Sequence, residues 1–318
     1  MRRKLRPPLP QRHGLDPARL RLPVEGSWAT LRDHLVERLP RVAPERIDVM
    51  LAEGRIYDLN GPVAPDAAFA PGTSVWFHRD LPEEVPVPFD LRVVYRDDAI
   101  LVVDKPHFLA TIPRGKHVVQ TALVRLRTEL GLPHLTPAHR LDRVTAGLVL
   151  FVVDPALRGK YQTMFKDRLV HKEYEAIAPY RAELETPVVV RSRIVKEKGV
   201  ITAQEVPGPV NAETRVELVQ RVEGVERGER VELGERVDVC GGWGRYRLLP
   251  FTGRTHQLRL HMASLGVPIR NDDFYPVLRE KPLDDFTDPL QLLAKVLAFT
   301  DPVTGASRRF VSSLSLSV

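Results

Sequence analysis

The chain has 318 residues, 43% of them hydrophobic and 28% charged, with a net charge of +6 and a pI near 9.5. This composition suffices for a buried core and excludes a chain that is disordered throughout. No apolar run approaches the roughly 18 residues of a membrane span, and the lone Cys240 excludes an intramolecular disulfide and a cysteine-rich metal cluster. We therefore expect a cytoplasmic protein.

Charge is unevenly distributed along the chain. Residues 1–22 carry seven basic residues and one acid, which gives +6. This Pro-interrupted stretch predicts a flexible arm that either follows a phosphate backbone or has no partner. Residues 23–90 carry six basic and twelve acidic residues, which gives −6, and residues 91–318 carry 34 basic and 28 acidic residues, which gives +6.

The segment after the arm predicts a small appended domain over residues 23–82. Leucine and valine recur at helical spacing between residues 31 and 39, and a second helix over 44–51 begins with a proline in its first turn. An Asn60-Gly61 turn and a short strand over 74–77 follow. The segment from Pro82 to Pro88 has the composition of a linker.

The larger region, residues 90–318, mixes strands and helices without a strict βαβ rhythm, which favours an α+β domain with a mixed sheet. Continuous or alternating apolar patterns predict strands over 100–103, 147–153 and 170–178. Helical spacing and capping residues predict helices over 122–130, 154–165 with an Asp154-Pro155 cap, and 255–266. The charged, Gly-punctuated segment 225–236 predicts a protruding hairpin.

Several common catalytic motifs do not occur in the sequence. It contains no P-loop, no G-x-G-x-x-G, no H-E-x-x-H and no G-x-S-x-G. His256 and His261 have the spacing of polar groups on a helix surface, and we do not interpret them as zinc ligands. Phosphoryl transfer, dinucleotide redox chemistry and zinc hydrolysis are therefore not expected.

Three segments remain unusual. Residues 139–147 place Asp142 between two arginines directly before a buried strand, where positive charge favours an ionised carboxylate; a structural ion pair is the alternative. Residues 252–261 put Arg254 at the start of a predicted helix, where it can hold an anion together with free backbone amides. The alternative is a basic helix on the protein surface. Tyr174 lies on a half-buried strand and is either a core residue or a site residue.

Taken together and in this order, these segments resemble the signatures of the RluA family of pseudouridine synthases. Residues 139–151 match H-R-L-D-x-x-T-S-G and its apolar continuation, with Ala146 where serine is usual. Residues 172–176 match K-x-Y-x-A, and residues 253–269 match G-R-T-H-Q-[LI]-R-x-H-x-x-x-x-G-x-P-I at nearly every position. After this segment the chain departs from the family, which usually has Gly-Asp where this chain has Arg270-Asn271-Asp272. We expect this difference to change the geometry of the loop and not the reacting group.

The resemblance covers residues 90–318 and implies a mixed, mostly antiparallel central sheet flanked by helices. The small domain at 23–82 resembles the ribosomal S-four-type RNA-binding domain, on its Glu53-Gly54-Arg55 segment and its Asn60-Gly61 turn. Its net charge of −6 departs from the basic helix face of such domains. We therefore expect RNA contact to be weakened there or moved to the basic arm.

The same resemblance implies roles for three catalytic residues. Asp142 would be the nucleophile acting on a flipped-out uridine, Arg254 would pair with Asp142 and orient it, and Tyr174 would stack on the base and help to remove the C5 proton. Arg140 would hold the loop and occupy the space left by the flipped nucleotide. The remaining substrate-binding residues would be His139, Lys172, Thr145, Gln257 and Arg259, with phosphate contacts from basic residues around 156–168. No metal and no organic cofactor is implied.

The implied partner is RNA. An appended RNA-binding domain favours ribosomal RNA by analogy of fold, and transfer RNA stays open as a substrate. A non-catalytic RNA-binding member of the family is a further alternative, although such a member has no need of Asp142, Tyr174 and Arg254 together. A hydrolase that uses Asp142 to release uracil is another. We expect a monomer with no membrane partner.

Overall fold

The computed structural model describes residues 6–81, 83–222 and 242–317. The chain divides into two compact units, Met1–Glu83 and Glu84–Val318, and each is described by itself. The hairpin expected at residues 225–236 lies outside the described residues. Within the described residues, no helix is long and apolar enough to cross a membrane.

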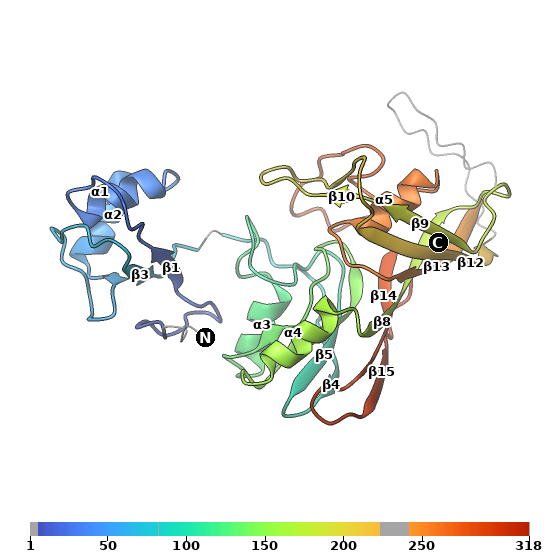
Figure 1. The fold of residues 1–318 in the computed structure, drawn as a ribbon, viewed down its shortest axis with the longest axis horizontal. Helices are drawn as coiled ribbons and strands as arrows, with labels where there is room; N and C mark the ends of the chain where they lie inside the picture. The colour runs from blue at the N-terminus through green and yellow to red at the C-terminus, as the bar shows by residue number, and fades with distance from the viewer. Residues whose placement is uncertain (1–5, 82, 223–241, 318) are drawn as a thin grey trace. The chain divides into compact units, whose positions relative to one another are not determined.

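The small unit packs two helices against a three-stranded antiparallel sheet (Figure 1). The helices are α1 (Leu31–Arg38) and α2 (Pro44–Ala52), and the sheet order is β1 (Ala18–Arg21), β3 (Ser74–Phe77), β2 (Ile56–Tyr57). Thr30 caps α1 in a capping box with Asp33, and Pro44 opens α2, as expected of residues that suit a first helical turn. Both helices begin at the residues that the sequence predicts.

Strand β1 lies inside the stretch that we expected to be a flexible arm. Its residues pair with β3 in antiparallel register, Ala18 opposite Phe77 and Arg21 opposite Ser74. Leu20 packs against the core of the unit, and Leu22, which follows the strand, is buried within it. Apolar residues at every second position are a strand pattern, which the high count of arginines obscured. The expected arm therefore has to be shortened to the residues before β1.

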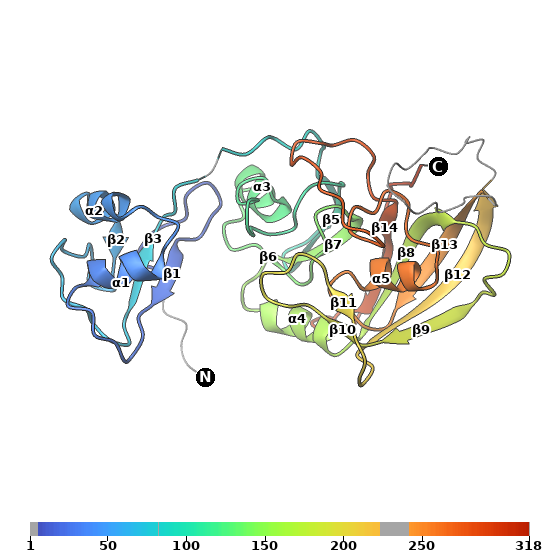
Figure 2. The ribbon, with the colours of Figure 1, turned by 90° about the horizontal axis from the view of Figure 1, so that it is seen from above.

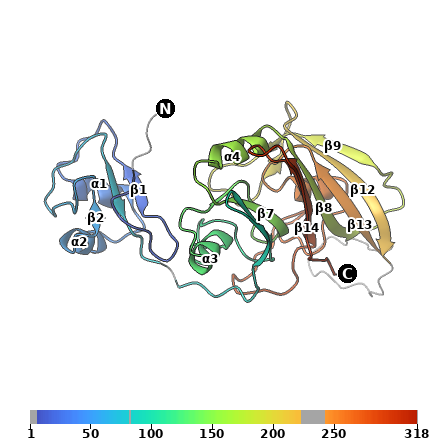
Figure 3. The ribbon, with the colours of Figure 1, turned by 90° about the horizontal axis from the view of Figure 1, so that it is seen from below.

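The large unit is built on a ten-stranded sheet whose centre positions the site (Figures 1 and 3). Only the β7–β14 pair is parallel among the described strands, so the expected mixed, mostly antiparallel sheet is confirmed. The strand order is β4 (Arg92–Arg96), β5 (Ile100–Lys105), β7 (Ala146–Val152), β14 (Leu292–Thr300), β8 (Val170–Pro179), β13 (Trp243–Pro250), β12 (Ala212–Val222), β9 (Val188–Ser192), with β6 (Thr136–Pro137) on β7 and β15 (Ser307–Val311) on β14. A separate pair, β10 (Ile194–Val195) and β11 (Gln204–Glu205), lies outside this sheet.

Helices α3 (Ala122–Glu129) and α4 (Arg158–Lys166) cover opposite faces of β5 and β7. Alternate residues of β5 explain this arrangement, because Leu101 packs with α3 while Val102 packs with α4. Helix α4 begins four residues later than predicted. The Asp154 carboxylate accepts a hydrogen bond from the Ala156 N–H instead of capping the helix, whose N-cap is Leu157.

Helix α5 (Gln257–Ser264) covers the other half of the sheet, where it packs on β8, β12 and β13 (Figure 2). At the centre, Gly147 allows β7 to approach β14 closely: its φ is +110°, and a Cβ there would lie 2.3 Å from the Ala294 carbonyl oxygen. Tyr174 of β8 pairs with Ala294 from the other side. The loop that precedes β7 and the middle of β8 therefore lie on either side of β14, close to each other.

Candidate active site

Asp142 lies in the loop that enters β7, with 39% of its side chain exposed. A turn closed by a hydrogen bond from the Thr145 N–H to the Asp142 carbonyl (3.2 Å) leads from this residue into the strand. The buried Thr145 belongs to the loop and is one of the predicted site residues. The loop therefore presents a partly exposed carboxylate from the edge of a rigid, buried strand.

Three side chains from residues 105–111 hold this loop. The Thr111 hydroxyl donates to the Leu141 carbonyl (2.7 Å) and accepts from the Leu141 N–H (3.1 Å). The buried Lys105 ammonium donates to the carbonyls of Pro106, Leu109 and Arg143, and burial lowers the pKa of Lys105 to about 7. His107 Nδ1 donates to the Val144 carbonyl at 2.7 Å. Leu141 and Arg143, the two neighbours of Asp142 in the sequence, are thus both hydrogen-bonded to side chains of residues 105–111.

A cavity of about 660 Å³ opens beside Asp142. Asp142 is the one carboxylate among its lining residues, whereas eight lysines and arginines line it. These are Arg114, Arg140, Arg143, Lys166, Arg168, Lys172, Arg254 and Arg259. A cleft with this excess of positive charge attracts a polyanion and concentrates it near the single carboxylate.

Tyr174 lines the cavity from the middle of β8. Burial, and then the negative charge of Asp142, raise the pKa of Tyr174 well above its usual value. The phenol therefore stays neutral at physiological pH and can stack on a base or donate a hydrogen bond. The expected help from Tyr174 in removing the C5 proton stays a prediction.

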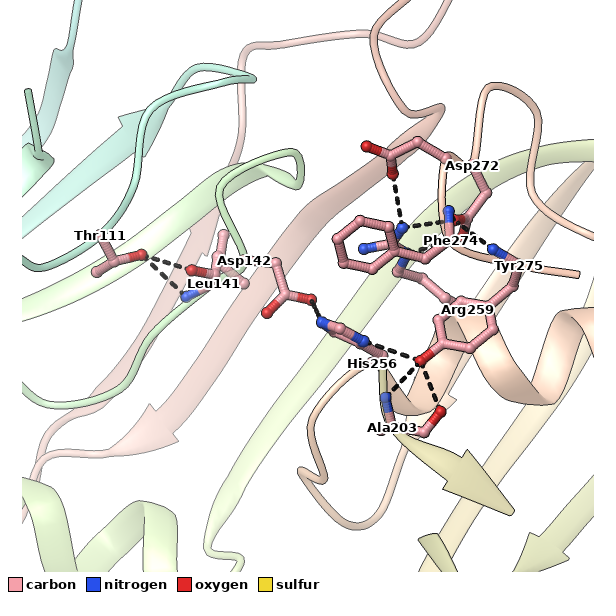
Figure 4. A network of polar contacts seen from close by, with 10 residues as sticks. Thr111, Leu141, Asp142, Ala203, His256, Arg259, Asp272, Phe274 and Tyr275 are labelled. Atoms are coloured by element: carbon pink, nitrogen blue, oxygen red, sulfur yellow. Dashed lines mark hydrogen bonds and ion pairs between the residues drawn. The ribbon is translucent and has the colours of Figure 1, made fainter. Parts of the chain in front are cut away.

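Arg254 does not form the ion pair with Asp142 that we expected. Its Nε donates instead to the Asn211 carbonyl at 3.1 Å, and no ion pair within 4.0 Å joins it to Asp142 in the described part of the chain. The group that faces Asp142 is His256, whose Nε2 lies 4.0 Å from Asp142 Oδ2 (Figure 4). Helix α5 starts at residue 257, later than expected, and His256 adopts a left-handed conformation that turns its ring inward. Arg254 keeps its place on the cavity wall.

Gln257 and His139 are both hydrogen-bonded within the protein. The Gln257 amide uses its full hydrogen-bonding capacity inside the protein, donating to Glu213 and Thr214 and accepting from Thr252 and Arg254. His139 Nε2 accepts the Leu150 N–H at 3.1 Å, and burial lowers the pKa of His139 to about 3. These hydrogen bonds give both side chains a place in the protein scaffold. Both also line the cavity, and their expected contact with RNA stays a prediction.

Arg259 is likewise occupied within the protein. Its side chain is 1% exposed and forms a forked pair with Asp272, and it also bonds Asp273 at 2.9 Å. The guanidinium lies 4.5 Å from the ring centroid of Phe274. The two carboxylates compensate its charge, and the negative charge of Asp142 also acts on it. This environment corrects the expectation that Arg259 binds RNA directly.

The remaining predicted ligands lie on the cavity wall. Arg140 is exposed at the cavity, and Lys172 is partly buried with its Nζ 3.4 Å from the Thr252 carbonyl. The basic residues expected to contact phosphates are represented on the wall by Lys166 and Arg168. In the described residues, no group of three or more His, Cys, Asp or Glu side chains is arranged to hold a metal ion.

Comparison with known proteins identifies the family. A family model described as RNA pseudouridylate synthase matches residues 99–264, just over half of the chain, including Asp142, Tyr174 and α5. The "Dual-specificity RNA pseudouridine synthase RluA" of Haemophilus influenzae is 30% identical over 235 residues, which cover 69% of this chain and 91% of that protein. The chain belongs to the RluA-type family of RNA pseudouridine synthases. It is an isomerase that converts uridine to pseudouridine in RNA.

Further relatives agree with this assignment of the synthase. The protein of the same name from Pasteurella multocida is 31% identical over 229 residues, covering 67% of this chain and 89% of its own. The solved structure of human RNA pseudouridylate synthase domain containing 1 shares the fold, with a TM-score of 0.51 and 23% identity over 72% of this chain and 85% of its own. About a third of the synthase chain lies outside the match to the curated relatives.

Sequence reasoning missed several residues of the synthase site. Arg114 and His117 face the cleft from a tight turn closed by two backbone hydrogen bonds between them. The signal was available, because Pro113-Arg114-Gly115-Lys116 combines turn residues with positive charge. His256 was interpreted as a surface group, although its side chain is 8% exposed. His261 is fully buried between Ser192 and Thr214, contrary to the same interpretation.

Proposed function

We propose that Asp142 is the nucleophilic carboxylate of this synthase and that the target uridine enters the cavity beside it. The supporting observation is that Asp142 is the single acid on a wall with eight cations, partly exposed and held on both sides. In the reaction the N1–C1′ bond of uridine breaks, a C5–C1′ bond forms, C5 loses its proton and N1 gains one. An ionised carboxylate close to the ribose and the base is needed throughout this sequence.

Tyr174 is proposed as the ring on which the flipped uracil stacks. It lines the cavity next to Asp142, and its raised pKa keeps the hydroxyl protonated. Arg140 and Lys172 are proposed as contacts to the phosphates or to the bases that flank the target. Removing a base from its stack costs a few kcal/mol, which favours loops and other unpaired targets. None of these roles calls for a metal or an organic cofactor, and we propose that the enzyme acts as a monomer.

The substrate is proposed to be ribosomal RNA, with transfer RNA as the second candidate. The small unit supports this choice, because it offers a large RNA a surface beyond the cleft. Its Arg32, Arg46 and Arg55 are ion-paired with acids. Arg19 and Arg21 face outward from β1, and Arg19 donates to the neutral Ser74 hydroxyl, so its charge stays available to a phosphate. Arg19 lies over the ring of Trp76, 5.5 Å from its centroid. An S-four-type role for this unit stays a proposal.

The test uses unmodified ribosomal RNA and transfer RNA in separate reactions with the full-length enzyme. Pseudouridine is mapped by carbodiimide-dependent stops in reverse transcription. We expect a stop at one ribosomal uridine and a weaker stop, or none, in transfer RNA. A stop confined to transfer RNA would overturn the proposed substrate.

A matched pair of variants then tests the small unit. Replacing Arg19 and Arg21 by glutamine should weaken the binding of ribosomal RNA, while replacing the ion-paired Arg32 and Arg46 should change it less. We expect a larger effect on affinity than on the rate of the bound reaction, since phosphate contacts position the RNA. Deleting residues 2–21 is a poor test, because the deletion also removes β1.

A further inference from the structure

His256 is held in an unusual conformation directly beside Asp142. It precedes α5 with φ 56° and ψ 19°, which residues other than glycine rarely adopt. Its ring packs against Phe274 and Tyr275, at centroid distances of 5.3 and 5.7 Å. The left-handed residue and the two aromatic contacts together fix the direction in which the ring nitrogens point.

The contacts of Tyr275 determine which nitrogen of His256 carries a hydrogen. A phenol has one hydrogen to donate and two lone pairs. The Ala203 N–H donates to the Tyr275 oxygen at 2.8 Å, and the Ala203 carbonyl accepts its hydrogen at 2.9 Å. With its hydrogen on the Ala203 carbonyl, the phenol has a lone pair left for His256 Nδ1 at 2.9 Å, and we assign the Nδ1–H tautomer on this network. In the neutral ring, Nε2 is then unprotonated.

That bare Nε2 faces the Asp142 carboxylate, as Figure 4 shows. The distance of 4.0 Å between Nε2 and Asp142 Oδ2 is too long for a hydrogen bond and short enough for an ion pair. With the ring neutral, two lone pairs face each other. With the ring protonated, an N–H faces the carboxylate. The charge on His256 thus decides whether Asp142 is free or paired.

Groups of both signs surround the ring. Asp142 from the loop before β7 and Asp272 from the segment after α5 favour the charged form, whereas Arg259 of α5 and Lys196 after β10 disfavour it. Tyr275 contributes its hydrogen-bond acceptor. Burial is the largest influence and lowers the pKa of His256 below its ordinary value. The neutral form therefore predominates near pH 7.

We propose that His256 is a positioning residue whose charge sets whether Asp142 is free or ion-paired. The neutral ring leaves both carboxylate oxygens free to act on uridine, and the imidazolium withholds Oδ2 in an ion pair. Tyr275 and the backbone of Ala203 hold the ring in place. The change between the two states therefore depends only on whether Nε2, 4.0 Å from Asp142 Oδ2, carries a hydrogen. The inference rests on the proposed role of Asp142.

Single-turnover rates measured against pH test the proposal. For the wild-type enzyme on an RNA that it modifies, we expect the rate to fall below an inflection that lies under pH ~6.5, the ordinary pKa of histidine. In His256→Asn this inflection should be lost, because the side chain that carries the titrating ring is gone. Asparagine suits the position because it tolerates a positive φ and its amide can still donate to Tyr275. An unchanged inflection in His256→Asn would overturn the proposal.

The control variant is His171→Asn. His171 lies in β8 with 55% of its side chain exposed, and its ring bonds Glu173. Its replacement should leave the inflection in place, because its ring does not face Asp142. RNA affinity and thermal unfolding measured at the same pH values separate a loss of binding or folding from a change in rate.

A second measurement does not depend on turnover. The pKa of His256 can be read from the imidazole resonances of the full-length protein, in the wild type and in Asp142→Asn. Removing an opposite charge about 4 Å away should lower this pKa by about one unit. The same value in both proteins would overturn the proposal. Turnover by Asp142→Asn would instead refute the proposed nucleophile and would leave this coupling intact, so the two failures are distinguishable.

Discussion

Thr111→Val tests how the loop that carries Asp142 is held. Valine keeps the shape of threonine and removes the hydroxyl that bonds both the N–H and the carbonyl of Leu141. Thr111 is 3% exposed and Leu141 is 8% exposed, so water has poor access to the freed groups. Each unsatisfied buried group costs about 1–3 kcal/mol, and we expect the free energy of unfolding to fall by about 2–4 kcal/mol.

The loss should also appear in the melting temperature and in the rate. In a unit of this size about 1 kcal/mol corresponds to roughly 2–4 °C, so Tm should fall by roughly 5–15 °C. Displacing the carboxylate by part of an ångström should slow the single-turnover rate about tenfold or more. Calorimetry gives the first value and pseudouridine formation gives the second.

Thr136→Val is the matched control for this prediction. The Thr136 hydroxyl is buried and has no hydrogen-bond partner in the described part of the chain, so its removal should leave stability unchanged or slightly raised. If Thr111→Val behaved like Thr136→Val in both assays, the idea that Thr111 holds the loop would be refuted.

Further predictions concern the buried ion pair, pH and salt. Asp272→Asn leaves the buried Arg259 guanidinium with Asp273 as its remaining acidic partner among the described residues. It should lower the free energy of unfolding in urea titrations by about 1.5–3 kcal/mol, and a loss below about 1 kcal/mol would count against the pair. Burial lowers the pKa of His139 to about 3 and of His261 to about 4. Below pH ~6.5 these two histidines bind protons in the unfolded chain but not in the folded chain. Their contribution to the free energy of unfolding should therefore be at its maximum above pH ~6.5 and should decline toward pH ~4. Equal stability at pH 7 and pH 5 would contradict this. Arg140→Gln should reduce the slope of log affinity against log salt by about 0.7, the value for one phosphate of a single strand that is no longer neutralised, whereas an unchanged slope would exclude a phosphate contact.

The elements and residues that the sequence predicted well depend on local patterns. The strand over residues 146–152 follows from a continuous apolar run, and the position of Asp142 at its entrance follows from that strand. Helix α2 begins at its predicted proline. These features are set by neighbours in the chain, so the pattern of apolar and capping residues contains the necessary information.

The features that the sequence did not reveal depend on distant partners. Gln257 is occupied by Glu213 and Thr214 of β12, more than forty residues away. The helix that follows His256 begins late, and the left-handed turn exchanges Arg254 for His256 beside Asp142. Neither arrangement leaves a periodic signal, because each is determined by which strands the fold brings together.

The central claim is that the Asp142 carboxylate carries out the isomerisation in the basic cleft. Asp142→Asn tests it most directly, since the amide keeps the size of the side chain and removes its charge. Single-turnover formation of pseudouridine and the affinity for the same RNA are measured on one preparation. We predict that the variant binds the RNA at least as tightly as the wild type and forms no pseudouridine. Pseudouridine formation by Asp142→Asn near the wild-type rate would contradict the claim.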